Sequence, residues 1–514
     1  MLTAVVFTPL VGALAILLLM AVAKVMRRQA DSARPKATSG WLKAGARARW
    51  VRGLAVAIAM AEMALSAIVF LSYDRELGGM QLVTRAAWIA PLNAQYHLGI
   101  DGLSAPLVLL TGLLGLCAVL SSWNVRRRVK EHFVWLLVLQ TAVMGVFTSL
   151  DFLLFFVFWE LELAPMYFII SIWGSGRKEY SALKFVAFTL FGSAFMLVGL
   201  LVVYFSTGTF DMVVLSQQQD WSNLIIPVQS VFFCFFLAFA IKLPTWPVHT
   251  WLPDAHTDAP TAGSVMLAGV LIKMGGYGII RVCVTMFPEV ARQYAWLLVT
   301  LGVISVIYGA IVTIRQSDLK RLIAYSSISH MGLVLIGVSS VGVTAEKLSA
   351  VGLSGAALQM FTHGTITGLM FLLVGFVYEK AHTRYIPDMS GLAPRMPFLA
   401  VFFVIAGLAS LGLPGLSGFV AELLVFLGTF PVWGWPTAIA VFGIVLTAAY
   451  ILWMVQRVMF GPALARYEHV GDASLAEAVP VVLLFLAILA VGVYPAWLTD
   501  VFNVGVAPII SRFG

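Results

Sequence analysis

The sequence predicts an all-α protein that crosses a membrane many times. Of its 514 residues, 61% are hydrophobic and only 11% are charged, whereas soluble globular chains carry about 25% charged residues. The apolar runs are about 20 residues long, which is the length of a membrane-spanning helix, and they do not alternate with polar residues. Because lipid admits only helices and closed barrels, and barrel strands alternate, we expect a polytopic helical membrane protein.

We expect about fourteen transmembrane helices of this length. Lys and Arg concentrate in the loops after the odd-numbered segments, and such residues favour the cytoplasmic side. Both termini are therefore expected on the non-cytoplasmic side of the membrane. The basic stretch 27–50 is expected to be a cytoplasmic loop that faces anionic lipid. The predicted segments are 3–24, 53–73, 103–123, 133–149, 151–173, 181–205, 228–252, 261–287, 294–314, 319–341, 349–378, 397–430, 436–460 and 476–499.

The motif content argues against several other classes of protein. Cys117, Cys234 and Cys283 lie far apart in apolar segments and form no CxxC pair, so neither a cluster nor a metal site is supported. The sequence has no G-x-G-x-x-G after a strand and no P-loop. We read the net charge of +8 as a topology signal rather than a sign of nucleic-acid binding, and the N-terminal apolar run as a first span rather than a signal peptide. No cofactor is expected in this chain.

Two predicted spans are interrupted. Segment 228–252 contains Pro244 and Pro247, and segment 397–430 contains the run LGLPGLSG. A proline inside a helix removes a backbone hydrogen bond, and broken helices five segments apart are typical of an inverted repeat around an ion path. We therefore expect broken helices 7 and 12 in an inverted five-helix repeat. The expected regions are an N-terminal three-helix region with its basic cytoplasmic loop (1–130), helices 4–8 as a first half-channel (131–287), helices 9–13 as a second half-channel (288–460), and helix 14 with a short tail (461–514).

A small set of ionisable residues lies inside the predicted spans. A charge at the bilayer centre costs about 2.5–3.5 kcal/mol, so such residues usually pair and line a polar path. Carboxylates and ammonium groups that lie close together change each other's affinity for protons, and histidines exchange protons near neutral pH. These residue types in this order indicate a proton relay. The candidate relay residues are Glu160, Lys242, Lys273, His330, His363 and Glu422.

Other interpretations of these residues stay open. Glu160 and Lys242 could form a static structural pair, and the two histidines could be satisfied core residues. Glu162 lies two positions from Glu160, so it is expected to face elsewhere on the helix. His249, seven residues after Lys242, is a possible extension of the relay.

The stretch WLPDAHTDAPT offers a different kind of site. Together with His249, the side chains of Asp254, His256 and Asp258 could suggest a metal ion. We instead favour Asp258 as the capped start of the next helix, because Pro and Thr follow it.

Four stretches resemble the antiporter-like subunits of respiratory complex I: FWELELAPMYFIISIWG, KLPTWPVHTWLPDAHTDAPTAGSVMLAGVLIKMGGYG, LKRLIAYSSISHMG and LPGLSGFVAE. The resemblance covers segments 3 to 14. It implies a proton-translocating subunit of an NADH:quinone oxidoreductase, with flavin and iron–sulfur clusters in partner subunits and with L-type and N-type subunits as membrane neighbours. It also implies that Glu160 and Lys242 are the interacting pair of the first half-channel, that Lys273 connects the halves, and that the two histidines lead toward Glu422.

Within that family the sequence is most similar to the M-type subunits. L-type, N-type and Mrp antiporter relatives usually have a lysine on broken helix 12, where this chain has Glu422, and the chain leaves no room for the lateral helix of L-type subunits. An Mrp-type cation/proton antiporter subunit, or the same role in a ferredoxin- or F420-dependent complex, is the alternative. Gln140 stands where some relatives have a glutamate, and the basic stretch 27–50 has no place in the family pattern.

Overall fold

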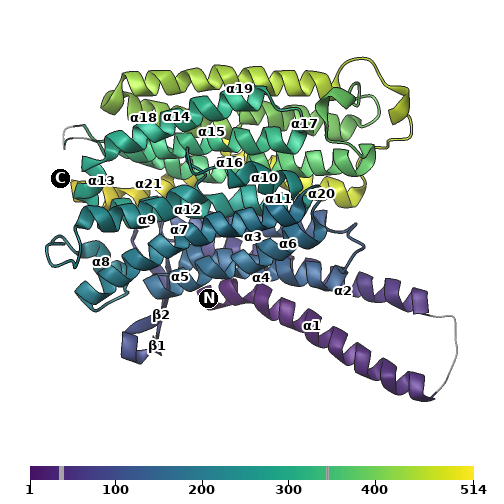
Figure 1. The fold of residues 1–514 in the computed structure, drawn as a ribbon, viewed down its shortest axis with the longest axis horizontal. Coiled ribbons are helices and arrows are strands. Elements are labelled where there is room, and N and C mark those ends of the chain that lie inside the picture. Colours follow the sequence, from purple (N-terminus) through teal and green to yellow (C-terminus); the bar gives the residue numbers. More distant parts are fainter. Residues whose placement is uncertain (34–39, 343, 345–346, 514) are drawn as a thin grey trace.

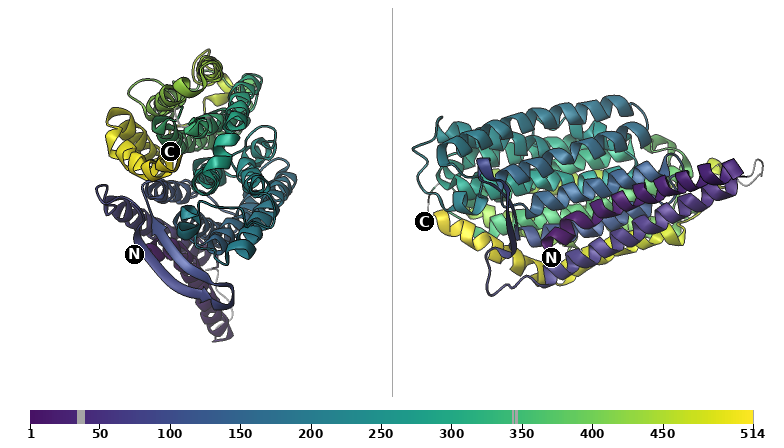
Figure 2. Two further views of the ribbon diagram at one scale, coloured as in Figure 1. Left: turned by 90° about the vertical axis from the view of Figure 1, so that its left-hand side faces the viewer. Right: turned by 90° about the horizontal axis from the view of Figure 1, so that it is seen from below.

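The computed structural model describes residues 1–33, 40–342, 344 and 347–513. Its helices run side by side in one bundle, and the end of α1 (Leu2–Ala33) and the start of α2 (Gly40–Leu71) project beyond it (Figure 1). Seen end-on, helices from the middle of the chain (teal) lie beside later helices (green), with the C-terminal helices (yellow) along one flank (Figure 2). In the described part of the chain, twelve helical stretches are long and apolar enough to cross a membrane. The polytopic helical class is thereby confirmed.

The N-terminal region differs from the prediction in two ways. α1 and α2 both extend into the stretch 27–50, which was expected to be a loop, because it is rich in Ala, Lys and Arg, which are strong helix formers. Residues 34–39 of that stretch lie outside the described residues. An antiparallel hairpin of β1 (Gln81–Ile89) and β2 (Ala94–Ile100) precedes α3 (Ser104–Ser121). The two strands contain no long apolar run, so the sequence does not predict this hairpin.

The middle of the chain supplies the helices around the first predicted break. The carboxylate of Asp151 accepts hydrogen bonds from the Leu153 and Leu154 amides. Asp151 therefore caps the helix that begins at Phe152. The elements are α4 (Val129–Thr148), α5 (Phe152–Leu161), α6 (Leu163–Trp173), α7 (Lys178–Thr207), α8 (Met212–Gln217), α9 (Val228–Lys242), α10 (Trp251–Asp258), α11 (Thr261–Met266), a π-helical turn (Leu267–Leu271), α12 (Ile272–Gly278) and a second π-helical turn (Ile279–Val284).

The remaining helices surround the second predicted break. The last predicted span, 476–499, instead ends at Val493, because Pro495 cannot continue a helix, and the expected tail forms a helix of its own that packs against α16. The elements are α13 (Pro288–Gln293), α14 (Ala295–Ile314), α15 (Leu319–Val338), α16 (Ala350–Ala381), α17 (Pro397–Ser410), α18 (Ser417–Trp433), α19 (Trp435–Met459), α20 (Leu475–Val493) and α21 (Ala496–Ile510).

The first break lies between α9 and α10, where the prolines predict it. Pro244 has no N–H for the carbonyl of Ala240. That carbonyl accepts instead from the Thr245 amide at 3.0 Å, and the next carbonyl, of Ile241, accepts from the Trp251 indole at 2.9 Å. The end of α9 is therefore satisfied by protein groups, as a helix end inside lipid must be.

The second break lies between α17 and α18, around a Leu-Pro-Gly turn. Gly412 and Gly415 have φ angles of +77° and +90° there, which favour glycine. A Cβ atom at Gly412 would also lie 2.5 Å from the Glu422 carboxylate. The helices at both breaks, α9, α17 and α18, are shorter than the twelve long stretches. The total of fourteen spans and the inversion of the repeat stay predictions.

A buried ion pair joins the start of α3 to the second π-helical turn. Arg281 donates to the Asp101 carboxylate at 2.6 Å, and the same oxygen accepts from the amides of Leu103 and Ser104. Burial alone would raise the pKa of Asp101, but Arg281 and the hydrogen bonds hold it below its usual value. Stability from this depressed pKa is present above the unfolded value, about 3.9, and is lost as the pH falls through the folded value.

Replacing Arg281 with Gln is expected to destabilise the protein by about 3–5 kcal/mol, because Asp101 would remain buried without its counter-charge. The measurement is thermal unfolding of the purified protein in detergent at neutral pH. Arg466→Gln is the matched control, since Arg466 also pairs with an aspartate, Asp388, but the two side chains are 52% and 49% exposed. An exposed pair contributes about 0–1 kcal/mol, so equal losses in the two variants would contradict the prediction.

Candidate functional site

Lys242 is the last residue of α9 and lies directly before the break. It forms an ion pair with Glu162, and both side chains are almost completely buried. The ammonium also lies over the rings of Trp159 and Phe185, at 5.3 and 5.5 Å from their centroids. At the C-terminal end of a helix the positive charge meets the negative end of the helix dipole. One carboxylate, two aromatic faces and a helix end therefore stabilise this charge.

The predicted direct pairing of Glu160 with Lys242 is not what the structure has, since Glu162 occupies that place. α5 ends at Leu161 because Pro165 has no N–H for the Leu161 carbonyl. The junction turns Glu162 inward, whereas Glu160, about 200° away around the helix, is half-buried. Its Oε1 atom has no hydrogen-bond partner among the described residues. The part of Glu160 in proton transfer stays a prediction.

Lys273 lies in α12 and is completely buried. Its ammonium donates to the carbonyl oxygen of Ala268, and its Nζ lies 2.7 Å from Nδ1 of His363 on α16. The π-helical turns on either side of α12 are a rare geometry that frequently occurs at functional sites. The structure thus brings together two of the predicted relay residues from helices about 90 residues apart in the sequence.

The line of ionisable groups continues from His363 to Glu422. The imidazole rings of His363 and His330 lie 5.5 Å apart between centroids, and His330 Nδ1 lies 3.5 Å from the Glu422 carboxylate. Ser410 Oγ, at the end of α17, lies 3.4 Å from the other His330 nitrogen. A small cavity opens between His330, His363 and Glu422. Four predicted residues on α12, α16, α15 and α18 therefore form one buried line.

α12 and the end of α9 pack closely together between these two groups. A Cβ atom at Gly275 would lie 2.5 Å from the Leu243 amide nitrogen and 2.6 Å from the Phe239 carbonyl oxygen. Only glycine permits such an approach of two backbones. Since Leu243 follows Lys242 and Gly275 lies two residues after Lys273, this contact places the two buried lysines on neighbouring, touching segments.

In the described structure, neither histidine of the stretch after the first break forms a hydrogen bond with a member of this line. His249 packs edge-on against the Tyr308 ring at 5.1 Å, and His256 stacks on Phe371 at 4.6 Å. The expected extension of the relay through His249 stays a prediction. Asp258 does not cap the next helix, which begins after Pro260 with no side-chain cap. Its carboxylate accepts instead from Ser181 at 2.6 Å, so it ties α10 to α7.

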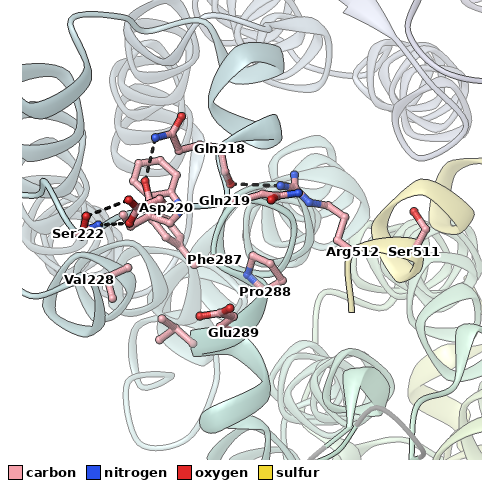
Figure 3. A pocket seen from close by; sticks show the side chains of 12 residues that line it. Gln218, Gln219, Asp220, Ser222, Val228, Phe287, Pro288, Glu289, Ser511 and Arg512 are labelled. Carbon is pink, nitrogen blue, oxygen red and sulfur yellow. Dashed lines mark hydrogen bonds between the residues drawn. The ribbon is translucent and has the colours of Figure 1, made fainter. Parts of the chain in front are cut away.

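One hollow on the surface lies away from this line. It has a volume of about 560 Å³ and lies where the loop after α8, the start of α13 and the C-terminal residues meet (Figure 3). Arg512 donates there to the Gln218 carbonyl, and Ser222 donates to Asp220. None of the predicted relay residues lines it, so the candidate site is the buried line and not this hollow.

Comparison with known proteins identifies the family. The model described as "NADH:quinone oxidoreductase/Mrp antiporter, TM" matches residues 149–447. The chain belongs to this NADH:quinone oxidoreductase/Mrp antiporter family. It is 40% identical to "NADH-quinone oxidoreductase subunit M" of Rhodobacter capsulatus over 91% of each chain. It is 41% identical to "NAD(P)H-quinone oxidoreductase chain 4 1" of Synechococcus elongatus over 90% of this chain and 87% of that one. The expected resemblance to M-type subunits is confirmed.

Solved structures show the same fold of the family. A chain of respiratory complex I from Thermus thermophilus with bound NADH is 29% identical, has a TM-score of 0.85 and is covered completely, as is this chain. A chain of the Mrp complex from Dietzia sp. has a TM-score of 0.83 at 21% identity, over 99% of this chain and 98% of that one. The second likeness shows the shared fold alone. All six predicted relay residues lie within the stretch that the family model matches.

Two features of the site in this family member were not expected from the sequence. Glu162 was expected to face elsewhere, although the Pro165 that breaks its helix was visible in the sequence. His256 was considered only as a metal ligand, yet it is completely buried, and neither ring nitrogen has a hydrogen-bond partner among the described residues. A buried polar group costs free energy unless it makes hydrogen bonds. The apolar residues that bury His256 come from helices far apart in the sequence, so the sequence does not predict its burial.

Proposed function

We propose that this chain is a proton-translocating membrane-arm subunit of an NADH:quinone oxidoreductase of the complex I type. The observation that carries the proposal is the buried line from Lys273 through His363 and His330 to Glu422. Its members are groups that bind and release protons, and they succeed one another at contact distances across four helices. A static core would not need a lysine, two histidines and a glutamate in succession at this depth, because each ionisable group costs free energy in lipid.

The energy of quinone reduction separates and restores the ion pair of Lys242 and Glu162. Breaking a buried ion pair costs about 3–5 kcal/mol, and moving a proton against about 150 mV costs about 3.5 kcal/mol. The two energies match. Separating Glu162 from Lys242 leaves an ammonium without its counter-charge, which favours release of its proton toward Lys273 on the neighbouring α12. Restoring the pair favours reloading.

The rest of the assembly follows from the same proposal. Electron transfer takes place in partner subunits that hold flavin and iron–sulfur clusters, and L-type and N-type antiporter-like subunits lie beside this chain in the membrane. Both termini face the non-cytoplasmic side. The predicted spans 4–8 (residues 131–287) and 9–13 (residues 288–460) act as two half-channels of opposite orientation. The region 1–130 precedes them, and the region 461–514 follows them.

A cation/proton antiporter subunit of the Mrp type is the second candidate, favoured by the shared fold. Glu422 speaks against it, because Mrp relatives usually have a lysine at this place. The line from Lys273 would then exchange sodium for protons without any electron donor. A donor other than NADH, such as ferredoxin or F420, would leave the role of this chain unchanged.

Replacing Lys242 with Ala in the assembled complex tests the proposal. Donor-driven quinone reduction and proton translocation are expected to fall together by at least about tenfold, equivalent to about 1.4 kcal/mol. Both are measured in the same membrane vesicles, after assembly has been verified. Lys130→Ala is the control, because Lys130 lies at the exposed start of α4 with 34% of its side chain accessible. Unchanged quinone reduction with a loss of sodium-driven proton exchange would instead identify an antiporter.

A further inference from the structure

One buried carboxylate has no part in the line described above. Glu62 lies in α2, within the span Arg47–Leu71, and is completely buried. Neither of its carboxylate oxygens has a hydrogen-bond partner, and it forms no ion pair, among the residues that the structure describes. A buried polar group without a partner is rare and costly, so its presence in the middle of an apolar helix calls for a function.

Contacts between α2, α3 and α4 give the depth of Glu62. A Cβ atom at Gly112 of α3 would meet Ser66 and Met63 of α2. Because α2 and α3 run in opposite directions, Glu62, one turn before Ser66, lies level with residues 115–116 of α3. A Cβ atom at Gly115 would in turn meet the Gln140 side chain of α4, at 2.7 Å from its carboxamide oxygen. Glu62 and Gln140 therefore lie at the same depth to within about one helical turn of 5.4 Å.

On the opposite side of α4, the ion pair of Lys242 and Glu162 lies at the same depth. Phe158 of α5 packs on Gly145 of α4, and Phe168 of α6 stacks on Trp135 at 4.7 Å. These helices are antiparallel, so each contact independently places Glu162 level with residue 141 of α4. Residue 141 is a buried threonine whose hydroxyl, like the Gln140 amide nitrogen, has no hydrogen-bond partner among the described residues. Buried polar groups on α2, on α4 and at the α5–α6 junction thus lie at about one depth.

Among the described residues packed against α2, none compensates a negative charge at Glu62. Residues 2–22 of α1 and the whole of α3 contain no charged residue. On α4 the nearest titratable group is His132, which lies two turns from Gln140 and pairs with Ser122. Arg52, on α2 itself, lies about 15 Å along the axis and donates to the Val125 carbonyl. An unpaired carboxylate there would be strongly disfavoured, so the carboxyl group holds a proton.

We propose that Glu62 is a proton-binding site that exchanges its proton with Glu162 across α4. The inference rests on the proposed function of the Lys242 pair. Once separated from Lys242, Glu162 is itself a buried carboxylate without a counter-charge. The O–H bond of Glu62 then breaks and an O–H bond forms on Glu162, by way of the Thr141 hydroxyl and the Gln140 amide, so that the negative charge moves from Glu162 to Glu62. No electron is transferred. Glu62 thus stores a proton on the α2 side of α4, beside the first half-channel. The reverse transfer returns the proton to Glu62.

Glu62→Gln in the assembled complex tests this inference. Gln reproduces the shape and the hydrogen bonds of a protonated carboxyl group but cannot release a proton. The infrared spectrum of the wild-type complex is expected to contain the carbonyl band of a protonated carboxyl group, which shifts in D₂O and is lost in Glu62→Gln. The number of protons translocated per quinone is expected to fall, while Glu76→Gln, a change in the exposed turn after α2, leaves both unchanged.

The opposite results would overturn the inference. A Glu62→Gln complex that keeps the band and the proton-to-quinone ratio would show that Glu62 is only a structural group. If Glu62→Gln does not assemble, Glu62→Asp, which keeps the carboxyl group, must move the band, and an unmoved band also overturns the inference. The Lys242→Ala variant separates this from the proposed function: if it still translocates protons, the proposed function fails, whereas the carboxyl band reports on Glu62 in either case.

Discussion

Replacing Lys273 with Met is expected to stop proton translocation while the complex still assembles. Met keeps the length and the apolar stem of Lys and fills the same buried space. It removes the ammonium that lies between the Ala268 carbonyl and the His363 ring, so the line toward Glu422 begins without a proton donor. We expect coupled quinone reduction to fall by at least about tenfold, or about 1.4 kcal/mol. The measurement is quinone reduction and vesicle acidification recorded together.

The control for this variant separates loss of the proton carrier from loss of packing. Lys130→Met makes the same chemical change at the exposed start of α4 and is expected to retain activity. Thermal unfolding should show that Lys273→Met is at least as stable as the wild type, because burying a methionine costs less than burying an ammonium. Retained proton translocation in Lys273→Met would contradict the assignment of the line from Lys273 to Glu422 as the path.

The sequence predicts much of this architecture because lipid imposes strict rules. Long apolar runs must be helices there, and Pro244 and the Leu-Pro-Gly turn before Glu422 must interrupt them, so both breaks lie where they are predicted. The lengths of α1 and α2 and the β1–β2 hairpin are less predictable. These elements lie where the chain leaves the apolar runs, and there helix propensity and strand pairing determine the structure.

The partners of buried charges are harder to predict than their positions. Glu160 and Glu162 are separated by one residue, and which of them meets Lys242 depends on the rotation of the chain at the α5–α6 junction. Arg281 follows a glycine-rich stretch near the end of a predicted span, where an exposed position is equally reasonable, yet it is buried against Asp101. The sequence does indicate the burial of Glu62, since it places this carboxylate in the middle of predicted segment 53–73.

Glu162→Gln is expected to damage both activity and stability more than Glu160→Gln. Without the Glu162 charge, Lys242 stays buried beside Trp159 and Phe185 with no counter-ion, and breaking such a pair costs about 3–5 kcal/mol. Glu160 is half-buried and makes no ion pair in the described structure, so its neutralisation is expected to leave stability nearly unchanged. Thermal unfolding and donor-driven quinone reduction of the two assembled variants make the comparison.

A double-mutant cycle decides whether the Glu162–Lys242 contact is direct. Residues in contact show coupling free energies of about 0.5–3 kcal/mol, whereas distant ones add independently. Lys242→Met combined with Glu162→Gln should recover much of the stability that either single change loses, because neither charge is then left alone. Combined with Glu160→Gln, Lys242→Met should show little coupling. Stronger coupling of Lys242 to Glu160 would mean that the lysine changes partner in the working complex, and that the pair seen here is one state of a switch between two carboxylates.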